Sequence, residues 1–182
     1  MSIGSANAQQ TAPAVRVEID RPQRSAQLKP YQAFVFFGLS VVLLLVATAL
    51  VKAALGVAHY PAKLQETVFA LHFWLVFAAI PLALVQIALP KGTVNHRLVG
   101  YAWCALLVGS ATVSFAMHEL TGGFSPPHAF SILTLVMVPL IVFFARSHRV
   151  VWHRNMVLGL CLVMILAGVL TFIPGRAIGS ML

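Results

Sequence analysis

The sequence predicts an all-α integral membrane protein, folded as a five-helix antiparallel bundle. Of its 182 residues, 60% are hydrophobic and only 9% are charged, and the mean hydropathy is +0.92. A soluble globular domain is usually about 45–50% apolar and about 25% charged, so this composition excludes an ordinary soluble domain and a disordered chain. Five long uncharged runs make up most of the chain. A polypeptide in lipid must satisfy its own backbone hydrogen bonds, which favours helices.

The first 30 residues differ from the rest because they are polar and carry both signs of charge. A secretory signal would place its apolar segment within roughly the first 15–30 residues, before a small-residue cleavage site. No such segment is present there. We therefore expect residues 1–30 to be a disordered cytoplasmic tail and residues 31–182 to be the five-helix transmembrane domain.

The apolar runs follow one another with short connections, which predicts antiparallel neighbours. A helix needs about 20 apolar residues to cross the hydrocarbon layer. The fourth run is the shortest, but it gains length from two prolines and His128 at its start, since proline is tolerated in a first helical turn. The predicted spans are residues 31–51 (extending past Lys52), 67–90, 98–117, 129–145 and 155–173.

The distribution of Lys and Arg predicts the orientation of the bundle. Cytoplasmic loops are enriched in these residues, and a cytoplasmic N-terminus places nine of the twelve on the inner side. We therefore expect a bacterial inner-membrane protein with a periplasmic C-terminus. The net charge of +8 reflects topology and lipid contacts rather than nucleic-acid binding, because no basic stripe with interleaved aromatics is present. The inner cations are Arg16, Arg21, Arg24, Lys29, Lys91, Arg97, Arg146, Arg149 and Arg154, and the outer ones are Lys52, Lys63 and Arg176.

Histidines are the candidate functional residues, since the chain has seven of them and only four carboxylates. An ionisable side chain within a bilayer is costly and is a functional candidate by default. Four histidines each lie near the start of a different helix: His72, His96, His128 and His153. Because alternate helices start on opposite sides, we expect the first and third of these near the outer face and the other two near the inner face.

An internal repeat pairs these histidines. His96 and His153 are 57 residues apart, each is followed by Arg, and His72 and His128 are 56 residues apart. The second and third helices therefore resemble the fourth and fifth as one repeated hairpin. A parallel repeat has its axis along the membrane normal. That axis predicts His72 opposite His128, and His96 opposite His153.

Two facing imidazoles are the axial ligand set of a six-coordinate haem b. Its propionates require cations, and the guanidinium fork of Arg matches a carboxylate. The sequence thus predicts one or two b-type haems, with iron held by the four paired histidines and propionates held by Arg97, Arg154 and Lys91. Stacked haems would carry electrons across the membrane as a cytochrome, an oxidoreductase component with quinone or a redox partner protein as its expected partner.

A plainer interpretation stays open for every histidine near a helix end, which can simply lie in the interface and bond to headgroups or to a carbonyl. The chain would then be a cofactor-free membrane subunit or scaffold of a larger complex, or an oligomer. A zinc hydrolase is poorly supported, because no ligand pair has metal spacing. Trp74, Trp103 and Trp152 lie near helix ends, which mainly indicates an aromatic belt.

The strings Leu71-His72-Phe73, Asn95-His96-Arg97-Leu98-Val99-Gly100-Tyr101 and Trp152-His153-Arg154-Asn155-Met156 resemble the bacterial membrane proteins of domain-of-unknown-function family 2306, over roughly residues 65–175. More distantly, the layout is similar to the transmembrane di-haem cytochrome b-561 type. That resemblance implies one histidine on each of four successive helices, paired as His72 with His128 and His96 with His153. The chain departs from that type in its shorter spacing between histidines.

Overall fold

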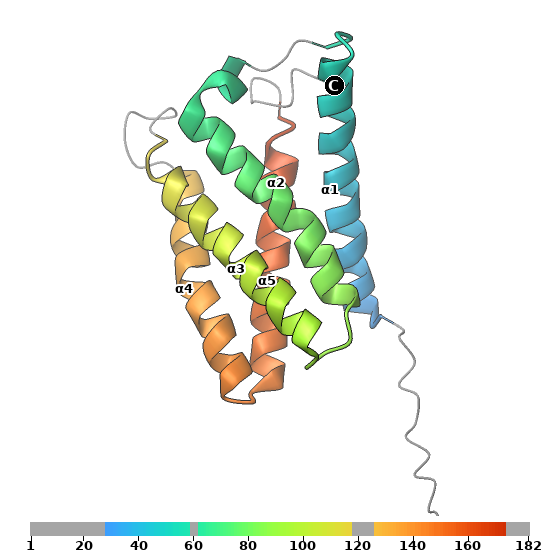
Figure 1. Ribbon diagram of the computed structural model, residues 1–182, viewed down its shortest axis with the longest axis vertical. Coiled ribbons are helices and arrows are strands. Elements are labelled where there is room, and N and C mark those ends of the chain that lie inside the picture. The colour runs from blue at the N-terminus through green and yellow to red at the C-terminus, as the bar shows by residue number, and fades with distance from the viewer. Residues whose placement is uncertain (1–27, 59–61, 118–125, 174–182) are drawn as a thin grey trace, which may run out of the picture.

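The computed structural model describes residues 28–58, 62–117 and 126–173. They form a bundle of five long helices in which successive helices run in opposite directions (Figure 1). The helices are α1 (Pro30–Ala54), α2 (Thr67–Ala88), α3 (Val94–Ser114), α4 (Pro126–Arg146) and α5 (Val150–Leu170), with a short 3-10 turn, η1 (Ala62–Gln65), before α2. The predicted all-α five-helix bundle is confirmed. Residues 1–27 of the predicted tail and the last nine residues lie outside the described residues.

All five helices are long and apolar enough to cross a membrane, and the chain is a multi-pass membrane protein. Its surface agrees with this, since many large apolar side chains point outward, including Phe34, Phe37 and Leu44, each more than 65% exposed. Apolar patches of this extent are rare on soluble monomers but suit contact with lipid.

The two ends of the bundle differ in how the helices are joined. One end, called the turn end below, holds the start of α1 and the short α2–α3 and α4–α5 turns (Figure 1). The opposite end, called the loop end, holds the starts of α2 and α4. The predicted hairpins α2–α3 and α4–α5 are both packed helix pairs.

Two helices begin earlier than the uncharged runs predict. Helix α3 begins at Val94, where the Thr93 side chain caps it by accepting a hydrogen bond from the His96 amide at 3.2 Å. Helix α5 begins at Val150, directly after the turn. The charged residues in these first turns interrupt the apolar runs but not the helical backbone. His96 and His153 therefore lie inside their helices.

The helices pack in a ring, in which α1 contacts both α2 and α5 and so closes it. Leu39, Trp103 and Leu160 fill the interior and are at most 1% exposed. Two glycines let α1 approach α5 closely: a Cβ on Gly38 would lie 2.8 Å from Ile165, and one on Gly168 would lie 2.6 Å from Val42. Small residues at such contacts are a common device for packing helices in lipid.

Candidate functional site

The four paired histidines lie at the expected ends of the bundle. His96 and His153, in the first turns of α3 and α5, lie at the turn end and are half-buried. His72, near the start of α2, and His128, near the start of α4, lie at the loop end. His128 is the most buried of the four, at 5% exposed.

His96 contacts a buried amide on the preceding helix. Nε2 of Gln86, near the end of α2, lies 3.2 Å from Nε2 of His96. An amide can serve either tautomer of imidazole, because its nitrogen donates to a bare ring nitrogen and its oxygen accepts from a protonated one. Gly100 makes room for this contact, since a Cβ there would lie 3.0 Å from the amide nitrogen. Gln86 therefore orients the His96 ring.

His153 is oriented by a backbone carbonyl. Its Nδ1 lies 3.0 Å from the carbonyl oxygen of Ile141 on α4. A carbonyl only accepts, so the ring proton is on Nδ1 and Nε2 carries the lone pair. Histidines that ligate metals are usually held in this way, by a hydrogen bond from the other ring nitrogen.

Lys91 lies in the α2–α3 turn, at the same end of the bundle as His96 and His153. Lys91 folds back onto α2, where its Nζ donates to the carbonyl oxygens of Gln86 (2.8 Å) and Ile87 (2.7 Å). The residue as a whole is exposed, but its ammonium group is partly buried, and this burial lowers the pKa of Lys91. Arg97 is exposed at the same end.

Arg154 lies on a different side of α5 from His153. Its guanidinium carbon lies 5.4 Å from the centre of the Tyr31 ring on α1, within the range of a cation–π contact. The five residues of the predicted inner site thus lie at one end, with Arg154 against α1 and His153 against α4.

Of the four buried polar atoms that lack a partner in the described part of the chain, three belong to residues at this end, and the fourth belongs to Trp103 at the middle of α3. Among the described residues, the buried side-chain nitrogen and oxygen atoms without a hydrogen-bond partner are Gln86 Oε1, His96 Nδ1, Trp103 Nε1 and Arg154 Nε. Gln86 is 7% exposed and Trp103 is 1% exposed. His96, Gly100 and Trp103 share one face of α3, because a helix repeats about every 3.6 residues. Buried polar groups normally have partners, so the turn end is chemically incomplete within the described residues.

The loop end is better satisfied. His72 donates from Nδ1 to the carbonyl oxygen of Ser110 at 2.9 Å, which leaves the lone pair on Nε2. His128 stacks on Phe115 with ring centres 5.7 Å apart. Both histidines thus lie against the last part of α3, one from α2 and one from α4. Ser114 and Ser131 join α3 to α4 through a 2.6 Å contact between their hydroxyls.

Sequence reasoning missed Gln86 at the turn-end site and placed Trp103 wrongly near a helix end, whereas it lies at the middle of α3. Gln86 lies in an apolar run, and its polarity inside a predicted span is the signal that singles it out. The belt interpretation is wrong for Trp103, which faces the interior of the bundle. Exposed Trp74 and Trp152 do lie on the surface. Within the described ranges, no three His, Cys, Asp or Glu side chains are grouped to hold a metal ion.

The family models, the curated proteins and the solved structures with which the chain was compared include none that matches it.

Proposed function

We propose that this chain is a b-type membrane cytochrome that carries electrons across the bacterial inner membrane, with its turn end toward the cytoplasm. The observation that carries the proposal is the presence, at that end, of His96 and His153 together with buried polar atoms of Gln86, His96 and Arg154 that have no partner among the described residues. A bound metal would supply a partner for the His96 nitrogen, and an anionic substituent would supply an acceptor for Arg154 Nε.

The turn end holds the kinds of side chain that would bind a haem b, which are two imidazoles with cations nearby. His153 offers Nε2 because its Nδ1 is held by the Ile141 carbonyl. In the structure the Gln86 amide nitrogen faces His96 Nε2. With that amide turned over, its oxygen would accept the Nε2 proton and leave the lone pair on Nδ1, which is one of the unpartnered atoms. Arg154 Nε is an unpartnered donor for a propionate oxygen. Lys91 and Arg97 supply further positive charge at the same end.

A haem would supply reversible one-electron chemistry, and the protein would supply its ligands, their orientation and a water-free surrounding. Gln86 and the Ile141 carbonyl would hold the two imidazoles in defined orientations. The packed interior around Trp103 and Leu160 excludes water from the path between the two ends. His72 and His128 are the proposed ligands of a second haem, and the held Nδ1 of His72 favours ligation through Nε2. Quinone, which shares the membrane, or a redox protein is the proposed partner.

The test is the absorbance of the full chain produced with haem available. We expect b-type bands in the reduced-minus-oxidised spectrum and one or two haems per chain by pyridine haemochrome. His96→Ala and His153→Ala should each lose the turn-end haem. His148→Ala is the matched control, because His148 is exposed at the same end and lacks a repeat partner. Protein without b-type bands, or equal loss in the control, contradicts the proposal.

A cofactor-free membrane subunit is the second candidate, and one observation favours it. His72 and His153 each bond to the backbone of a neighbouring helix, so they also act as polar links within the two hairpins. Such links are worth roughly 0.6–2 kcal/mol in membrane bundles. On this alternative, His72→Ala and His153→Ala lower the free energy of unfolding by that amount in protein that never binds haem, and partner binding is unchanged.

A further inference from the structure

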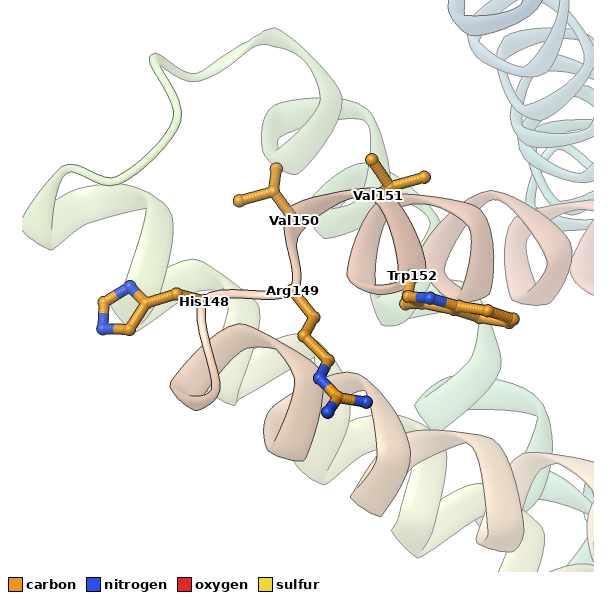
Figure 2. Close-up of a pocket in the computed structure, with 5 residues that line it drawn as sticks. All are labelled: His148, Arg149, Val150, Val151 and Trp152. Carbon is orange, nitrogen blue, oxygen red and sulfur yellow. The ribbon is translucent and has the colours of Figure 1, made fainter.

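The α4–α5 turn forms a hollow of about 530 Å³ at the turn end, lined by His148, Arg149, Val150, Val151 and Trp152 (Figure 2). It opens to the outside of the bundle and is separate from the four paired histidines. In the close-up, the Arg149 guanidinium extends away from the backbone on the side from which the Trp152 indole also projects. A positive group and an apolar ring therefore border the same hollow.

The cations around this hollow lack an anion within the described residues. The one carboxylate in those residues is Glu66, which lies before α2 at the loop end. The backbone of Arg149 is hydrogen-bonded to Phe144 and His153, but its guanidinium makes no hydrogen bond within the described residues. Arg146 on the same turn, in contrast, reaches the Tyr101 hydroxyl at 3.4 Å. A free guanidinium with a planar fork of donors matches a phosphate or carboxylate. The hollow thus favours an anionic ligand supplied from outside the described chain.

The other lining residues are apolar and exposed. Val150, Val151 and Trp152 follow one another in sequence and are 69%, 60% and 56% exposed. Trp152 is fixed in place by stacking on Phe144, with ring centres 5.9 Å apart. Tryptophan is enriched at membrane–water interfaces, where one part of the side chain meets lipid and another meets water. A ligand that fits this hollow has an anionic head joined to an apolar body.

The equivalent α2–α3 turn does not offer the same site. Its cation, Lys91, already donates to the carbonyl oxygens of Gln86 and Ile87. The two turns therefore differ in whether the side chain of the cation is hydrogen-bonded to the protein itself. In the α4–α5 turn Arg149 is available.

We propose that this hollow binds the headgroup phosphate of an anionic membrane phospholipid, with Arg149 on the phosphate and the Trp152 indole against the glycerol and upper acyl chains. Phosphate is also available as a free ion, but the exposed Trp152 indole favours the lipid. The proposal is independent of haem binding.

The experiment measures thermal unfolding of the detergent-solubilised full chain, and bound lipid by native mass spectrometry, during titration with short-chain phosphatidylglycerol. Phosphatidylcholine of the same chain length and inorganic phosphate are titrated in parallel. We expect phosphatidylglycerol to raise the unfolding temperature in a saturable way with one tightly bound lipid, and the other two ligands to have little effect. Stabilisation by inorganic phosphate alone to the same extent would overturn the lipid assignment.

Two variants locate the site. A hydrogen bond to a charged group is worth about 1.5–3 kcal/mol, so Arg149→Gln should weaken the apparent affinity for phosphatidylglycerol by about 10-fold or more. Lys29→Gln is the matched control, because Lys29 is exposed directly before α1 at the same end and does not line the hollow. It should keep the wild-type affinity. Equal weakening in both variants would show that the lipid is attracted by the overall positive charge of this end and not by Arg149, and would overturn the proposal. Arg149→Lys keeps the positive charge but loses the planar guanidinium donors, so it should give an intermediate affinity. This variant replaces Arg149→Gln in the experiment if Arg149→Gln does not fold.

Discussion

The side-chain amide of Gln86 lies 3.2 Å from the ring of His96, although the two residues belong to different helices. The α2–α3 turn brings the last turn of one helix beside the first turn of the next. Gly100 keeps open the space that the amide occupies. One buried amide, one histidine and one glycine thus form a unit that sets the orientation of a candidate ligand.

Replacing the amide tests that unit. Gln86→Leu keeps the volume but leaves His96 without its partner, and we expect retention of the turn-end haem to fall on the order of 10-fold, as for other residues that orient metal ligands. The free energy of unfolding should change by only about 1 kcal/mol, because the unpartnered Oε1 is removed as well. Haem content and urea unfolding measure the two effects. Ser114→Ala, which alters the loop end, is the control and should keep the turn-end haem; a wild-type spectrum and haem content in Gln86→Leu would contradict the role.

Two glycines of α3, Gly100 and Gly109, allow a comparison of alanine variants with and without crowding of the Gln86 amide. Glycine inside a helix costs roughly 0.5–1 kcal/mol relative to alanine, so Gly109→Ala, whose Cβ would meet Leu75 at an ordinary 3.6 Å, should be neutral or stabilising. Gly100→Ala crowds the Gln86 amide at 3.0 Å and should be less stable than Gly109→Ala by about 1 kcal/mol. Denaturant unfolding of both variants measures the difference. Equal stabilities would mean that Gly100 does not make room for the amide.

The close contact between α1 and α5 depends on Gly168. A Cβ at that position would lie 2.6 Å from Val42, which is buried, so Gly168→Ala should destabilise the bundle by about 1–3 kcal/mol. Gly159→Ala is the comparison, since its Cβ would meet only the end of the flexible Met137 side chain at 3.4 Å. Adding Val42→Ala to Gly168→Ala should recover part of the loss. Failure of that rescue would place the cost elsewhere than at this contact.

Lys91 gives a pH dependence with a definite sign. Burial lowers its pKa in the folded protein below the ordinary 10.5. Between those two pKa values the unfolded chain binds more protons than the folded chain, so stability rises with pH. The wild-type protein should therefore gain stability relative to Lys91→Gln as the pH increases toward 10.5 from below. Unfolding of both proteins across the alkaline range isolates this group from other titrations, and a difference that falls with pH would contradict the assignment.

The amino-acid sequence alone determined the spans and the level of the histidines in the bundle. An apolar run long enough to cross lipid has one stable backbone conformation there, so composition and length suffice to predict five helices. Their alternation then fixes which end holds His96 and His153 and which end holds His72 and His128. The repeat of the His-Arg string also identified the two hairpins. The start of α3 was predicted at residue 98, but the helix begins at Val94. Charged residues in a first helical turn interrupt an apolar run without interrupting the helix.

Tertiary packing decided what each histidine touches. The Ile141 carbonyl beside His153, the Ser110 carbonyl beside His72 and the amide of Gln86 beside His96 all come from neighbouring helices, and the rotation of a helix about its axis determines which atoms meet. Trp103 faces inward for the same reason, although its position near the start of the predicted apolar run suggested the surface. Hydrophobicity places a segment in the membrane, but lipid is equally apolar on every side of a helix. The rotation is therefore set by close packing and hydrogen bonds between helices, which exist only once all five have assembled.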